Sequence, residues 1–197
     1  MCPDVAQYQY LFGVAMMTAG DLVRATDALQ AADRLEPGRA LTLTALGLAL
    51  NSRKQYAEAK AALSRSLELN PESPPAIAAL AESEASLGEF DAAERDARRA
   101  LAGSPDEATA HLVIGMVSIQ KERYAEARDA LLRAAAADPR SAKADYQLSL
   151  VYARLGDTAA AERSLDSYRR KLAQIDENVK AMRAATFPMA RPGGGPQ

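Results

Sequence analysis

Prolines recur along this chain at a constant interval of 34 residues, at Pro37, Pro71, Pro105 and Pro139. The segment before the proline recurs as well, because YAEAKAALSRSLELNP at 56–71 returns as YAEARDALLRAAAADP at 124–139. A fixed period of this length is typical of proteins that stack one supersecondary unit many times. We therefore expect the apolar residues to be buried between successive units of a stack, and not in one round core.

The period divides most of the chain into five repeats, at 6–39, 40–73, 74–107, 108–141 and 142–175. Position 20 of the repeat is always alanine: Ala25, Ala59, Ala93, Ala127 and Ala161. Position 8 is always small: Gly13, Gly47, Ala81, Gly115 and Ser149. Position 24 is always apolar: Leu29, Leu63, Ala97, Leu131 and Leu165. This pattern predicts that every repeat is the same two-helix unit.

Helical periodicity explains the spacing. Positions 4, 7, 8 and 11 share one face of a first helix, and positions 20, 24 and 27 share one face of a second. Small residues at positions 8 and 20 let the two helices cross closely. Position 15 ends the first helix, where Gly20, Gly88 and Gly156 suit a reversal of the chain. The recurring proline lacks an N–H and ends the second helix.

Repeat three departs from this pattern, because Glu84 and Ala97 replace the larger apolar residues of its neighbours. We predict that it is the place where the stack bends or opens first. Beyond repeat five, the apolar residues Leu172, Ile175, Val179 and Met182 form a helical stripe. We assign 176–185 to a capping helix, either continuous with the preceding helix or separated from it near Asp176. Residues 186–197 are rich in Pro and Gly, and we expect them to be disordered.

The start of the chain carries a further sign of the repeat, because Pro3 lies 34 residues before Pro37. We interpret residues 1–5 as the end of an earlier repeat, with coincidence as the alternative. On the first interpretation, more repeats or a targeting segment precede Met1. The residues after Met1 do not form a signal peptide. The default expectation is therefore a cytoplasmic protein, whereas a missing upstream signal segment would direct it to the periplasm.

Residues for catalysis or metal binding are scarce. The chain has one histidine, His111, and one cysteine, Cys2. His111 stands at a packing position, so we expect no metal site, cofactor or catalytic triad, and no enzyme. Carboxylates such as Glu94, Asp96 and Asp129 are expected on solvated faces. The net charge of −2 and the absence of a long apolar run indicate neither a nucleic-acid surface nor a membrane span.

The register of five alanines and four prolines resembles the tetratricopeptide repeat family. The resemblance implies an all-α, right-handed superhelical solenoid of five helix pairs with a C-terminal capping helix. Two departures are that position 4, often tryptophan in the family, is Gln9, Leu43, Ile77, His111 and Asp145, and that Ala173 replaces the last proline. In the family, the first helices line a concave groove that binds another protein.

The resemblance also implies which residues face that groove. In the family, positions 2, 5, 9 and 12 of the first helix point into the groove. The residues that we assign to it stand at positions 5, 9 and 12: Tyr10, Val14, Met17, Thr44, Leu48, Asn51, Glu82, Leu112, Met116, Ile119, Tyr146 and Leu150. They are mostly apolar, and position 5 holds no cation, unlike the carboxylate clamp of chaperone-binding members.

We therefore expect a non-catalytic adaptor that binds an apolar peptide or an amphipathic helix of another protein. The alternatives are the repeat portion of a larger enzyme or envelope assembly factor, and a module that associates with itself through the groove. The groove residues would instead be buried within the chain if the superhelix tightened or the cap folded back.

Overall fold

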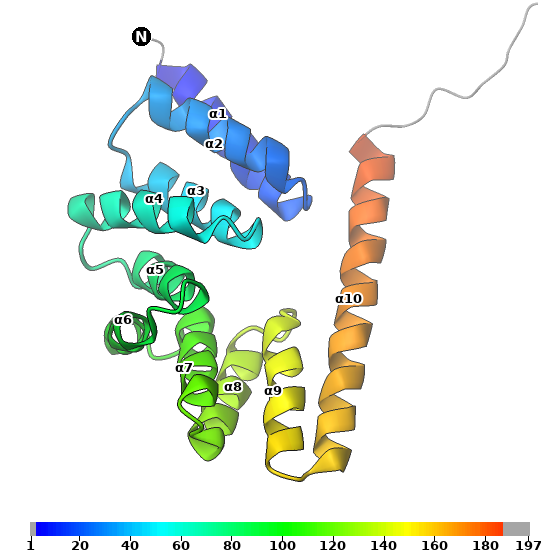
Figure 1. The fold of residues 1–197 in the computed structure, drawn as a ribbon. Helices are drawn as coiled ribbons and strands as arrows, with labels where there is room; N and C mark the ends of the chain where they lie inside the picture. The colour runs from blue at the N-terminus through cyan, green and yellow to red at the C-terminus, as the bar shows by residue number, and fades with distance from the viewer. Residues whose placement is uncertain (1–2, 187–197) are drawn as a thin grey trace, which may run out of the picture.

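The computed structural model of the chain describes residues 3–186, which form ten α-helices and no strand (Figure 1). The first helices of the five repeats are α1 (Pro3–Thr18), α3 (Ala40–Ser52), α5 (Pro74–Ser86), α7 (Ala108–Gln120) and α9 (Lys143–Arg154). The second helices are α2 (Leu22–Leu35), α4 (Tyr56–Leu69), α6 (Phe90–Gly103), α8 (Tyr124–Ala137) and α10 (Thr158–Thr186). The prediction of an all-α repeat solenoid is confirmed.

The four spaced prolines lie in the turns between repeats, whereas Pro3 is the first residue of α1. The last helix continues through Asp176 without a break and is 29 residues long. Val179 of the predicted apolar stripe lies on this helix. The side chain of Met182 and the residues 187–197 lie outside the part of the chain that the structure describes.

Within a repeat, the helices cross where a glycine faces a leucine. A methyl group added at Gly47 would lie 2.4 Å from Cγ of Leu63, and one added at Gly115 would lie 2.5 Å from Cγ of Leu131. Repeat three has alanine at both positions instead, and Ala81 and Ala97 are fully buried. The two residues at the crossing are therefore complementary in size, since glycine stands with leucine in repeats two and four and alanine stands with alanine in repeat three.

The turn inside each repeat has a left-handed residue at position 15. The residue is glycine in three repeats, with φ from 76° to 84° at Gly20, Gly88 and Gly156. The other two repeats place Lys54 at φ 62° and Glu122 at φ 57° in the same turn. The backbone shape of the turn is thus common to all five repeats, although the residue that favours it is not.

Between repeats, the first helix packs on the second helix of the preceding unit. Polar groups reinforce the contact between repeats two and three, since Asn51 donates to the carbonyl of Ala79 at 2.8 Å and accepts from Ser83 at 2.7 Å. His111 is buried, and its Nε2 lies 2.8 Å from the carbonyl oxygen of Pro105.

The prediction that Glu94 is solvated is wrong. Glu94 is buried and accepts hydrogen bonds from Lys121 at 2.6 Å and Arg123 at 2.9 Å. The physical reason is its place on α6, at position 21 of the repeat, where its side chain meets Lys121 and Arg123 of the turn between α7 and α8. The hydrogen bond from Lys121 is the main cause that lowers the pKa of Glu94 to about 2. This cluster joins repeats three and four.

The last helix leaves the stack and crosses its open side (Figure 1). Its first half is fixed to α9, where the rings of Tyr146 and Tyr168 are 5.3 Å apart and Lys171 pairs with Asp145. Its second half extends back toward the first repeat, so that a methyl group added at Gly20 would lie 3.0 Å from Val179. The C-terminal helix therefore spans the curve of the solenoid from one end to the other.

Candidate protein-binding groove

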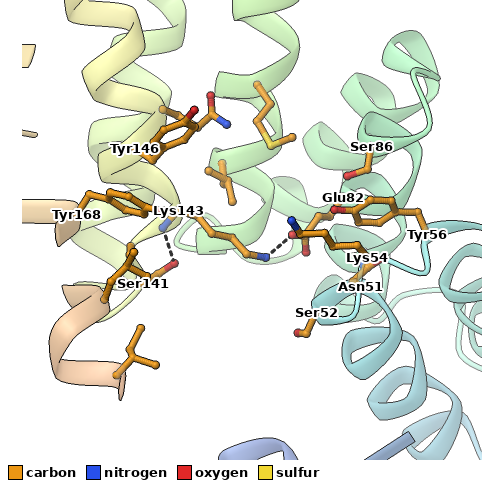
Figure 2. Close-up of a pocket in the computed structure, with 16 residues that line it drawn as sticks. Asn51, Ser52, Lys54, Tyr56, Glu82, Ser86, Ser141, Lys143, Tyr146 and Tyr168 are labelled. Carbon is orange, nitrogen blue, oxygen red and sulfur yellow. Dashed lines mark hydrogen bonds and ion pairs between the residues drawn. The ribbon is translucent and has the colours of Figure 1, made fainter. Parts of the chain in front are cut away.

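A cavity of about 460 Å³ lies between the first helices of repeats two to five and α10 (Figure 2). Residues of α3, α5, α7 and α9 line one side, and residues of α10 line the other. The cavity exists because α10 crosses the concave side of the stack at a distance. Its walls differ in chemistry from one end to the other.

One end of the cavity is apolar. Leu112 and Met116 of α7 lie there with Tyr146 of α9. Opposite them, Leu172 and Ile175 of α10 remain 43% and 46% exposed, although large apolar side chains are usually more deeply buried than this. This end offers apolar surface that the chain itself does not cover.

The other end is polar. Lys143 of α9 pairs with Glu82 of α5 and thereby links repeats five and three across the cavity (Figure 2). Lys54, in the turn after α3, also lines the cavity and has no ion pair with any residue in the described part of the chain. Since Glu82 is already paired, the polar end presents a net positive charge at neutral pH.

The predicted groove residues fall into two groups. Those that line the cavity are Asn51, Glu82, Leu112, Met116 and Tyr146. Among these, Asn51 and Leu112 are buried, so that only a small part of each side chain meets the cavity.

The remaining predicted residues lie outside this cavity. Tyr10, Val14, Met17 and Leu48 pack partly buried against the core of the first repeats, and the guanidinium of Arg39 lies 5.6 Å from the centre of the Tyr10 ring. The hydroxyl of Thr44 is 2.7 Å from that of Ser66. Ile119 packs against the core of the last repeats, and Leu150 is exposed. The first repeat thus contributes no residue to the cavity.

The sequence reasoning missed the cavity residues that lie outside positions 5, 9 and 12. Those from α10 are Tyr168, Leu172 and Ile175, and the two lysines are Lys54 and Lys143. The apolar stripe of 172–182 was the available signal, and it was interpreted as a cap that faces the stack. Lys54 carried no signal, because it stands at the turn inside repeat two. Lys143 stands at position 2 of repeat five, a position that the family resemblance directs into the groove, but it was not named among the groove residues.

Two further structural findings concern other kinds of site. Within residues 3–186, no group of His, Cys, Asp and Glu side chains is arranged to hold a metal ion. No helix in the same range combines the length and the apolar character that crossing a membrane requires.

Sequence models described as tetratricopeptide repeat match residues 40–73, 78–142 and 119–174, which is more than half of the chain. The chain belongs to the tetratricopeptide repeat family. Proteins of this family act as scaffolds for protein interaction, and the architecture of this tetratricopeptide repeat chain is theirs. A search of curated protein sequences finds no significant match.

Solved structures similar to this tetratricopeptide repeat chain support the same fold. TTC0263, a thermophilic TPR protein of Thermus thermophilus, shares 18% identity and a TM-score of 0.72, covering 93% of this chain and all of its own. A crystal structure of MamA shares 20% identity and a TM-score of 0.59, covering 96% of this chain and 99% of its own. MamA 41-end from Desulfovibrio magneticus RS-1 shares 19% identity and a TM-score of 0.61, covering 87% and 97%. At these identities the likeness concerns the fold.

Proposed function

We propose that this chain is a non-catalytic adaptor that binds an extended, largely apolar segment of another protein in the cavity between the first helices and α10. The observation that carries the proposal is the apolar end of the cavity, where Leu172 and Ile175 stay partly exposed opposite Met116. An inserted apolar side chain would remove this surface from water, at roughly 25 cal/mol per Å².

The proposed ligand is extended because an extended peptide is narrower than an α-helix, which is about 10 Å wide with its side chains. We propose that such a segment enters the cavity with α10 in place, and that an amphipathic helix would be accommodated by a movement of the second half of α10.

The polar end of the cavity suggests the charge of the bound segment. Lys54 has no ion pair with any described residue, and Lys143 is already paired with Glu82. An acidic side chain elsewhere on the segment would complement the charge of Lys54. The proposed ligand is therefore an extended peptide that carries an apolar anchor and a carboxylate.

Selection of peptides from a random displayed library against the whole chain tests the proposal. The selected peptides should be apolar and acidic, and Met116→Glu or Leu172→Glu should weaken their binding at least tenfold. Leu132→Glu is the matched control, because Leu132 is an exposed leucine on α8 outside the cavity. Lys54→Glu should change the selected charge from acidic to basic. Equal binding by the wild-type chain and by both cavity variants would refute the proposal.

A further inference from the structure

One ion pair between described side chains joins two repeats that are not neighbours. Lys143 of repeat five extends across the cavity to Glu82 of repeat three (Figure 2). The other ion pairs of the described residues lie within one helix, within one repeat or between adjacent repeats. Helix α7 packs on both α5 and α9, whereas the backbones of α5 and α9 are too far apart for contact. The two side chains therefore bridge a gap that the helices themselves leave open.

The same two residues are the only charged ones at the groove positions of the repeats. Positions 2, 5, 9 and 12 of the five repeats are otherwise uncharged. Where repeat three has Glu82 at position 9, the other repeats have Val14, Leu48, Met116 and Leu150. Where repeat five has Lys143 at position 2, the others have Gln7, Leu41, Pro75 and Thr109. Two charges of opposite sign on an otherwise uncharged surface indicate that these residues act as a pair.

Other charged groups do not take the place of either partner. Asp145 lies closest to Lys143 in the sequence and pairs with Lys171 of α10. Asp138, in the turn before α9, accepts hydrogen bonds from backbone N–H groups of its own turn. The side chain of Glu82 is only 12% exposed, so its ionised carboxylate needs a partner within the chain. Lys143, at the start of α9, provides that partner from two repeats away.

The location of this pair connects it with the shape of the solenoid. In a stack of repeats each unit contacts its neighbours only, and the curvature results from small rotations at successive junctions. A link between repeats three and five closes a ring that runs through α5, α7 and α9. Because the link lies on the concave side, it resists flattening at both junctions together. An ion pair with an exposed partner is weak and is screened by salt, so this link is reversible.

We infer that the pair of Lys143 with Glu82 is a latch that fixes the curvature of repeats three to five and thereby the width of the cavity. While the pair is formed, α9 is held toward α5. When it breaks, α9 moves away from repeat three together with α10, which is fixed to it through Tyr146 and Tyr168. The two sides of the cavity then separate. The latch is a property of the chain without a ligand, so this inference does not depend on the proposed function.

The distance between two spin labels tests the latch. Leu87 and Leu155 are exposed and stand at position 14 of repeats three and five, at the ends of the first helices. The parent chain for labelling therefore carries Leu87→Cys and Leu155→Cys in a Cys2→Ser background. Glu82→Gln and Lys143→Gln should each broaden the distribution of label distances and shift its mean to longer values. Salt at about 1 M, where the screening length is about 3 Å, should have the same effect on the parent and none on Glu82→Gln.

Lys54→Gln is the matched control for the loss of a positive charge. Lys54 lines the same cavity and has no ion pair with a described residue, so Lys54→Gln should leave the label distances unchanged. Circular dichroism shows whether each variant keeps its helices. Equal distributions for the parent, Glu82→Gln and Lys143→Gln would overturn the inference. A shift in Lys54→Gln as large as theirs would overturn it as well, because the charge of the cavity and not the pair would then set the curvature.

Discussion

At the scale of single residues, the turn at position 15 of the repeats shows that one backbone shape can form with different residues. Gly88 and Gly156 adopt left-handed angles without strain, whereas Lys54 and Glu122 adopt nearly the same angles with a side chain. For residues other than glycine, the left-handed region costs roughly 1–2 kcal/mol. Two of the five turns therefore carry a backbone penalty that the surrounding packing offsets.

Glu122→Gly should stabilise the folded chain by about 0.5–1 kcal/mol, because relief of the left-handed strain exceeds the entropy that glycine adds to the unfolded state. Urea unfolding followed by circular dichroism measures the change. Gly88→Ala is the control in the opposite sense and should destabilise the chain. Nothing lies within 4 Å of the added methyl group, so the loss of stability comes from the backbone angle alone. Loss of stability in Glu122→Gly would show that its side chain holds the turn.

Two glutamates that lie ten residues apart have pKa values that are shifted in opposite directions. Burial, together with the neighbouring charge of Asp96, raises the pKa of Glu84 to about 7, although Lys60 lies 3.9 Å away. The pKa of Glu94 is lowered to about 2 by its hydrogen bonds and its positive neighbours. A buried carboxylate at the centre of repeat three thus opposes folding once it is ionised, whereas Glu94 supports folding when ionised.

The stability of the chain should therefore depend on pH through Glu84. The unfolded glutamate loses its proton near pH 4.5 and the folded one near pH 7, so this contribution decreases as pH rises between these values and is constant above them. Glu84→Gln should raise the free energy of unfolding at pH 8 by roughly 1–3 kcal/mol and have much less effect near pH 5. Urea unfolding at both pH values measures the change.

Glu94→Gln is the matched control for this prediction. It should destabilise the chain at pH 8 by about 1–2 kcal/mol, because Lys121 and Arg123 lose the carboxylate that they share. A stability difference between Glu84→Gln and the wild-type chain that is the same at pH 5 and pH 8 would mean that Glu84 keeps an ordinary pKa.

At the scale of helices, the crossing within each repeat depends on a matched pair of residues. Sequence reasoning predicted a small residue at position 8 and interpreted Ala97 of repeat three as lost contact. The structure pairs Ala97 with Ala81 and buries both completely, so the missing leucine is partly offset by a larger partner. A single-sequence pattern treats positions one at a time, and this is why the pairing could not be predicted from it.

The alanine pair of repeat three suggests a test in repeat two. Gly47→Ala should cost about 1–3 kcal/mol of stability, because the new methyl group would meet Leu63 at 2.4 Å. Leu63→Ala should cost about 2–5 kcal/mol through the cavity that it leaves. The double variant should be at least about 1 kcal/mol more stable than the sum of the two effects predicts. Strict additivity in urea unfolding would show that the two positions do not share one space.

At the scale of the whole molecule, the repeat period predicted the stack but not the path of its last helix. Helix ends follow from local signals such as the spaced prolines and the turn at position 15. The path of α10 depends on contacts with no equivalent in the other repeats, namely the rings of Tyr146 and Tyr168 and the pair of Lys171 with Asp145. The α10 side chains of the cavity could not be predicted for the same reason, whereas Lys143 stands at position 2 of its repeat and could have been assigned to the groove.

The two halves of α10 are held very differently, and this leads to a last prediction. Residues 158–171 pack on α9, whereas Leu172 and Ile175 are nearly half exposed, so the second half can separate from the stack at little cost. Amide hydrogen exchange should be faster in 172–186 than in α3 to α9. Tyr168→Ala, which removes the ring that contacts Tyr146, should extend fast exchange toward Thr158.

Leu69→Ala, at an exposed leucine of α4, is the control for this measurement and should leave the exchange of α10 unchanged. A peptide bound in the cavity should slow exchange in 172–179, because it would bridge Leu172 and Met116. Equally slow exchange along the whole of α10 without any peptide would mean that the second half of the helix does not separate from the stack. A helical ligand would then be excluded from the concave side, and the cavity would admit only an extended chain.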